Sequence, residues 1–175
     1  MIDLLRERRS VRVYEKREIE PEKLEILKEA LVRSPSSRNI NPWEFIMVDN
    51  KGLLKQLSEA KEYGSEFLKD AALGIVICGN EKKSDVWIED CSIASILVQM
   101  VAQSIGMGSC WIQIRNRMHD ATMTSEEYIR KILGIPENIR VESIISIGYP
   151  GENKSGIPKE KLLFGKIKMN SYSML

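Results

Sequence analysis

The segment 91–105 constrains the fold of this chain more than any other feature. Its hydrophobic pattern predicts a helix over 85–105 whose apolar residues go almost all the way round. These residues are Cys91, Ile93, Ala94, Ile96, Leu97, Val98, Met100, Val101, Ala102 and Ile105. A helix that is apolar on every side must be buried on every side. In a chain of only 175 residues, a second subunit is one way to complete that burial.

Helices and strands alternate around this segment. Amphipathic spacing predicts a helix over 21–33, with Pro21 in its first turn and Ser34-Pro35 at its end. Further helices are expected at 3–9, 51–60, 65–70 and 125–133, and strands at 45–48, 73–78, 109–112 and 141–147. No Gly-x-Gly-x-x-Gly follows a strand, which disfavours a doubly wound dinucleotide-binding fold. We therefore expect one mixed α/β domain over 1–175 with layered helices and strands.

Charge and cysteine content exclude several classes of function. The net charge is +1 and the signs are interspersed, so no overall field attracts nucleic acid or acidic membranes. The stretch around 93–105 is too short and too polar to span a membrane, and no signal region opens the chain. Cys78, Cys91 and Cys110 lie in apolar runs and predict buried thiols in a reducing compartment. We expect a cytoplasmic protein whose anion sites are built locally.

Two polar segments are candidates for such a site. Arg8-Arg9-Ser10-Val11-Arg12 concentrates fixed positive charge beside a hydroxyl, as phosphate recognition requires. Ser34-Pro35-Ser36-Ser37-Arg38-Asn39 with Pro42-Trp43 offers short hydrogen-bonding groups that could contact the edge of a planar heteroaromatic. Taken alone, each segment is better explained by a solvated basic helix end or by an ordinary polar turn. The same holds for Lys159 and Lys161, which could reach an anion or simply be solvated.

Side chains able to catalyse a reaction by themselves are scarce. The single histidine, His119, lies in a polar stretch and belongs to no recognisable triad. The spacing of His, Cys and acidic residues matches no metal site. If the chain is an enzyme, a cofactor would therefore carry the chemistry while the protein positions it.

The order of these segments resembles the FMN-dependent nitroreductase superfamily, in its compact branch. Five segments carry the resemblance along nearly the whole chain. They are Arg8–Arg12, Ser34–Asn39 with Pro42-Trp43, Trp87 through Gly106-Met107-Gly108-Ser109-Cys110-Trp111-Ile112, Ile147-Gly148-Tyr149-Pro150, and Lys159-Glu160-Lys161-Leu162. No single segment is decisive, but the ordered set at these separations is specific.

The resemblance implies an α+β fold with three layers, in which helices flank a central, mostly antiparallel sheet. It also implies an intertwined homodimer with two FMN molecules at the interface. The segment 91–105 would lie at the core of that dimer. The tail, about 150–175, would wrap around the partner subunit.

The resemblance also implies which residues contact FMN. Arg8 and Ser10, with Arg9 beside them, would hold its phosphate and ribityl end, Lys159 and Lys161 would complete the phosphate site, and Arg12 would face the pyrimidine edge. Pro35, Ser36, Ser37 and Asn39 would come from the other subunit. Trp111, Ile112, Gln113 and Ile114 would line the flavin near N5, with a backbone N–H, that of Gln113, reaching N5. No catalytic side chain and no metal ligand is expected.

The chain departs from the family pattern at several positions. Asn41 stands where glutamine is common, and Lys161 replaces an arginine and so loses its bidentate geometry. Gly64-Ser65-Glu66-Phe67 offers no certain group for the pyrimidine edge. Ile114-Arg115-Asn116-Arg117 is unusually basic, which could recruit an anionic reductant or substrate or be surface charge.

Three functions are compatible with the sequence. The first is an FMN oxidoreductase that uses NADH or NADPH in ping-pong hydride transfer to a nitroaromatic, a quinone or another small electrophile. The second is an FMN-binding carrier or sensor without efficient turnover. The third is a structural dimer that has lost the cofactor, against which Arg8, Ser10, Arg12, Ser36 and Asn39 together argue. The sequence identifies neither the physiological acceptor nor the preferred nicotinamide.

Overall fold

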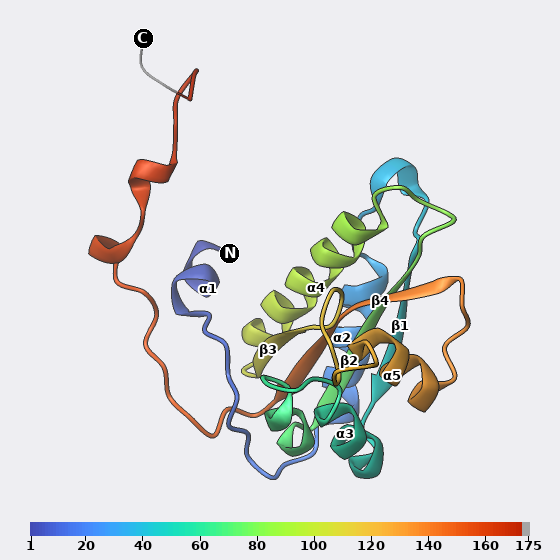
Figure 1. Cartoon of the computed structure of the whole chain (residues 1–175). Helices are drawn as coiled ribbons and strands as arrows, with labels where there is room; N and C mark the ends of the chain where they lie inside the picture. The colour runs from blue at the N-terminus through green and yellow to red at the C-terminus, as the bar shows by residue number, and fades with distance from the viewer. Residues whose placement is uncertain (173–175) are drawn as a thin grey trace.

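A four-stranded sheet forms the centre of the computed structural model, which describes residues 1–172 (Figure 1). Its order is β1-β2-β4-β3 and every pair of neighbouring strands is antiparallel. The strands are β1 (Trp43–Val48), β2 (Leu73–Asn80), β3 (Gly108–Gln113) and β4 (Ile139–Gly148). The two central strands are buried along almost their whole length, since both of their faces are covered.

Helices cover both faces of the sheet, and a hydrophobic core lies on each side. On one face α2 (Pro21–Val32) and α4 (Trp87–Ser104) pack against the sheet, with Leu27 of α2 in one core with Ile75 and Ile145 of the strands. The other face is covered by α3 (Lys51–Ser58), the 3-10 helix η2 (Glu66–Asp70) and α5 (Ser125–Leu133). Leu54 of α3 lies there in one core with Ile112 and Ile144 of the strands. The α+β class with a layered antiparallel sheet is thereby confirmed. No helix in residues 1–172 is both long and apolar enough to cross a membrane.

Local signals fix the bounds of α5. The Thr124 side chain accepts from the backbone N–H of Glu127, whose carboxylate accepts in return from the backbone N–H of Thr124. Gly134 ends the helix in the left-handed region at φ 65°. The prediction of a helix over 125–133 is therefore correct at both ends.

One face of α4 stays open in the single chain. Cys91, Ala94 and Val98 are completely buried against the sheet. Ile93 and Ile96, by contrast, are 39% and 41% exposed. One subunit therefore does not bury this helix on every side, because the neighbouring elements reach only part of its circumference, and the completion of its burial by a second subunit stays a prediction.

The C-terminal tail begins by binding the N-terminal segment. The backbone N–H of Arg12 donates to Glu152 Oε1 (2.7 Å), Lys154 Nζ donates to the carbonyl of Ser10 (3.0 Å), and the Arg9 guanidinium donates to the carbonyl of Ser155. These three bonds hold the segment 152–155 against the strand-like stretch that follows α1 (Ile2–Glu7).

Beyond this root the tail leaves the body of the molecule. We call residues 157–172 the arm; it carries two short 3-10 helices, η3 (Lys159–Lys161) and η4 (Phe164–Lys166), and every one of its side chains is exposed. Figure 1 shows the arm running past α1 and away from the sheet. Its exposed apolar residues include Leu163, Phe164, Ile167 and Met169. The final residues of the predicted tail, 173–175, lie outside the described part of the chain.

Candidate functional site

The N-terminal basic segment lies along the start of β3. The backbone N–H of Val11 donates to the carbonyl of Ser109 (3.0 Å), and Ser10 and Ser109 form a parallel bridge. The close approach needs Gly108, because a Cβ there would lie 2.8 Å from the side chain of Val11. The segment thus continues the sheet at its otherwise open β3 edge.

Three cations and a hydroxyl gather around the Cys110 thiol. Burial raises the pKa of Cys110, and the charges of Arg12, Lys154 and Arg8 oppose that rise together with a hydrogen bond from Ser10. These groups come from the start of the chain, from β3 and from the root of the tail. The fold therefore places Arg8, Ser10 and Arg12 near one another, and their binding of a cofactor stays a prediction.

Arg8 and Arg12 have charges that no neighbouring carboxylate neutralises. Within residues 1–172 neither side chain forms an ion pair. The Arg12 guanidinium instead lies 5.7 Å from the ring centroid of Phe67 on η2. The Arg9 guanidinium instead donates a hydrogen bond to the carbonyl of Ser155. The donor set fits a phosphate beside Arg8 and an electron-rich ring edge beside Arg12.

The outer edge of β3 offers backbone donors to a ligand. In an antiparallel strand, successive residues direct their N–H and C=O groups to opposite edges. The Ser109 carbonyl faces the N-terminal segment, whereas the Ile114 N–H faces β4 and donates to the carbonyl of Glu142 (3.2 Å). By this alternation the N–H groups of Trp111 and Gln113 are on the same side as the Ser109 carbonyl and face away from β4. Ile112 and Ile114 have completely buried side chains, so they can reach a ligand only through their backbone.

The segment 35–39 is an ordered but conformationally costly loop. The N–H of Ser37 donates to Asp90 Oδ1 (2.8 Å), and Ser36 Oγ accepts from the backbone N–H of Asn41 (2.8 Å). Arg38, Asn39 and Asn41 all have φ between 51° and 55°, the left-handed region that residues other than glycine seldom adopt. Pro35 and Asn39 are exposed beside them. Such strain is often retained where a loop binds a ligand.

This loop and the basic segment lie at opposite ends of α4. Asp90, which holds the loop, is in the first turn of α4, whereas Ser109, which pairs with Ser10, comes after its end. An α-helix of 18 residues is about 27 Å long. One subunit therefore cannot bring Pro35, Ser36, Ser37 and Asn39 to the ligand that Arg8 binds. Lys159 and Lys161 are likewise exposed on the arm, without an ion pair in residues 1–172.

Sequence reasoning missed two lysines of this region. Lys154 reaches the Ser10 carbonyl and Glu152 from the root of the tail. Lys61, just after α3, is half-buried, and both its burial and the nearby charge of Arg117 lower its pKa. The only local sign that Lys61 is partly buried is its position directly after the buried residue Ala60. Nothing in the neighbouring sequence indicates that Lys154 contacts the N-terminal segment.

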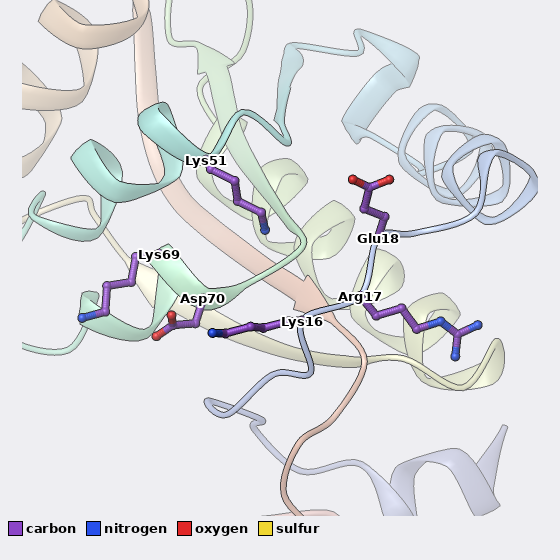
Figure 2. A pocket seen from close by; sticks show the side chains of 6 residues that line it. All are labelled: Lys16, Arg17, Glu18, Lys51, Lys69 and Asp70. Atoms are coloured by element: carbon purple, nitrogen blue, oxygen red, sulfur yellow. The ribbon is translucent and has the colours of Figure 1, made fainter.

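A separate hollow lies between the chain after Tyr14 and the start of α3. It has a volume of about 330 Å³ and is lined by Lys16, Arg17, Glu18, Lys51, Lys69 and Asp70 (Figure 2). Figure 2 shows Arg17 directed away from Lys69 and Asp70. Arg17 pairs with Glu20, and Lys51 Nζ donates to the carbonyl of Ala71 (2.8 Å). The hollow contains no residue of the predicted site.

The described part of the chain contains no cluster of three His, Cys, Asp or Glu residues able to hold a metal.

Comparison with known proteins agrees with this geometry. A model described as the nitroreductase family matches residues 5–149. The chain belongs to the nitroreductase family. A protein of Archaeoglobus fulgidus, named provisionally as an NADH dehydrogenase/NAD(P)H nitroreductase, is 40% identical over 84% of this chain and 83% of its own length.

Solved structures of nitroreductases share the whole architecture. An FMN-dependent nitroreductase from Clostridium difficile is 45% identical, with a TM-score of 0.97 over 98% of this chain and 100% of the other. A protein of Bacteroides thetaiotaomicron with the same provisional name as the archaeal relative is 31% identical, with a TM-score of 0.88 over 98% and 97%. Because both matches cover 98% of this chain, they include most of the arm.

Proposed function

We propose that this nitroreductase is an FMN-dependent oxidoreductase that takes hydride from NADH or NADPH and delivers it to a small electrophile. The expected acceptor classes are nitroaromatics, quinones and activated alkenes. One observation carries the proposal: Arg8 and Arg12, unpaired with any carboxylate of residues 1–172, meet Ser10 at the open edge of β3. The name of the Clostridium difficile relative supports FMN as the group bound there.

The residues of this edge would hold the cofactor by its charged and polar ends. Arg8 and Ser10 would bind the phosphate and the ribityl chain, Arg12 the pyrimidine edge, and the outward N–H of Gln113 the N5 atom. FMN held by these residues would supply the redox chemistry, namely hydride transfer from the nucleotide to the acceptor. Because one pocket would serve both substrates in turn, the kinetics would be ping-pong.

The site would be completed by a second copy of the chain. The open face of α4 at Ile93 and Ile96 and the exposed arm provide apolar surface for such a partner. A partner lying across α4 could bring Pro35, Ser36, Ser37 and Asn39 to the opposite end of that helix, which one subunit cannot do. Lys159 and Lys161 would add charge at the phosphate.

The test is to load the purified protein with FMN and mix it with NADH or NADPH in a stopped-flow spectrometer. Bleaching of the bound flavin, followed by its return when a quinone is added, is the expected result. A protein that binds no FMN would end the proposal. Bound FMN that neither nucleotide bleaches would instead indicate a carrier or sensor. Native mass spectrometry of the same sample should show two subunits and two FMN masses.

A further inference from the structure

Lys61 and Arg117 are two cations on separate segments, which the hydrogen bond between His119 and the carbonyl of Glu59 holds side by side. Lys61 follows α3 and Arg117 follows β3, and each lies within the electrostatic field of the other. Neither forms an ion pair within residues 1–172. The carboxylate whose charge acts on Lys61, that of Glu66, is held by the backbone N–H of Gly64, 2.9 Å from each of its oxygens.

The fold fixes the loop that presents Arg117. A turn closed by the N–H of Arg117 donating to the carbonyl of Ile114 (3.1 Å) passes through Asn116 at φ 57°. The next part of the loop is attached to the end of α3, because His119 Nδ1 donates to the carbonyl of Glu59 (2.8 Å). The His119 ring also stacks on Tyr128, with 3.9 Å between centroids. The two segments that carry the cations are therefore joined.

An external anion bound between Lys61 and Arg117 would relieve the repulsion between their charges. Bringing two cations together lowers the stability of the folded state unless a negative charge binds between them, and burial of Lys61 strengthens the effect. The neutralising group would lie close to the proposed N5 contact. The turn from Ile114 to Arg117 keeps the Cα atoms of these residues within about 7 Å, and Gln113 immediately precedes it.

We propose that Lys61 and Arg117 bind the phosphate groups of the nicotinamide dinucleotide that reduces the protein. The inference rests on the proposed function, in which the nicotinamide ring meets the site beside Gln113. The phosphates of the same molecule lie one ribose beyond that ring, so the cations that bind them must lie a short distance along the surface. The turn that places Arg117 next to Ile114 provides that position.

The test uses the FMN-loaded protein and the variants Lys61→Gln and Arg117→Gln, alone and combined. In ping-pong kinetics, kcat/KM for the nucleotide reports only its own half-reaction. We expect it to fall about fivefold for each exposed or half-exposed charge removed, and further for the double variant. The kcat/KM for an uncharged quinone and the affinity for FMN should stay unchanged. Lys131→Gln removes an exposed charge of α5 and is the matched control.

Comparison of the two nucleotides identifies the phosphate that is bound. Equal losses with NADH and NADPH would assign the pair to the pyrophosphate, and a loss with NADPH alone would assign it to the 2′-phosphate. Arg117→Lys should restore part of the rate. Unchanged kcat/KM for both nucleotides would overturn the inference, as would weaker FMN binding by the variants, which would place the pair in the flavin site. Failure of the wild type to bind FMN would instead refute the proposed function.

Discussion

Two arginines of this chain differ in what surrounds them. Arg33 on α2 pairs with Glu29 (2.6 Å) at the surface, whereas Arg8 lies beside Cys110 without an ion pair in residues 1–172. Arg8→Ala should therefore weaken FMN binding about tenfold to a hundredfold, since a hydrogen bond to a charged group contributes about 1.5–3 kcal/mol. Arg33→Ala should leave it unchanged. Titration of flavin fluorescence measures both constants, and equally small effects would show that the phosphate assignment is wrong.

Tyr149 makes the stability of the fold depend on pH. Its hydroxyl donates to Glu20, and this bond is the main reason that the pKa of Glu20 falls to about 2. A lowered carboxyl pKa contributes stability above the unfolded-state value and loses it as pH falls through the folded value. Tyr149→Phe should therefore be less stable than wild type at pH 7, by a difference that narrows between about pH 4.5 and pH 2.

Thermal denaturation from pH 7 to pH 2.5 measures that difference. Tyr63→Phe is the matched control, because Tyr63 is exposed and should show no pH-dependent difference from wild type. A Tyr149→Phe deficit that stays constant over this range would contradict the role assigned to Glu20.

The residues of the site were predictable where they are neighbours in sequence. Arg8, Ser10 and Arg12 alternate along one extended segment, so a short pattern suffices to group them. Lys154 joins them through a contact between residues 144 positions apart, which no local pattern encodes. Arg38 in the left-handed region is also unpredictable, because its side chain has no preference for that conformation.

Elements with strong local signals were predicted with accurate bounds, and elements stabilised by tertiary contacts were not. The helix α5 has a capping box and a terminal glycine, and both of its ends agree with the prediction. The strands β2 and β4 extend beyond the predicted 73–78 and 141–147, because pairing at their ends continues through less apolar residues such as Asn80 and Arg140. The open face of α4 depends on which elements happen to reach it, and periodicity cannot show that.

The capping box of α5 also supports the loop that carries Arg117. Thr124 caps the helix and forms a bridge with Met118 in that loop. Thr124→Ala should lower the free energy of unfolding by about 1 kcal/mol, since the N–H of Glu127 loses its acceptor. Thr124→Ser keeps an acceptor oxygen and should retain most of that stability. Urea denaturation of both variants measures the effect, and equal losses would show that the hydroxyl is not the stabilising group.

At the scale of the whole molecule, one chain contains both halves of the proposed ligand site but holds them apart. The basic segment lies beyond one end of α4 and the strained loop lies beside the other. Two copies of the chain whose α4 helices packed antiparallel would therefore bring the loop of one copy next to the basic segment of the other. The arm would then lie on the partner, which would cover side chains that are exposed in the single chain. The apolar pattern of 91–105 indicates a partner surface, but only the resemblance implies which residues a partner would bring to the site, and the dimer stays a prediction.

Gly156 tests whether the course of the arm matters for assembly. At this position a Cβ would lie 1.8 Å from the carbonyl oxygen of Arg6, so a side chain must displace the arm from α1 where the two cross. At Gly165, also in the tail, a Cβ would have no atom within 4 Å. Gly156→Ala should therefore raise the dimer dissociation constant about tenfold or more, equivalent to at least about 1.4 kcal/mol, while Gly165→Ala should not. Sedimentation equilibrium measures both, and identical constants for the two variants would mean that the arm does not contribute to the dimer.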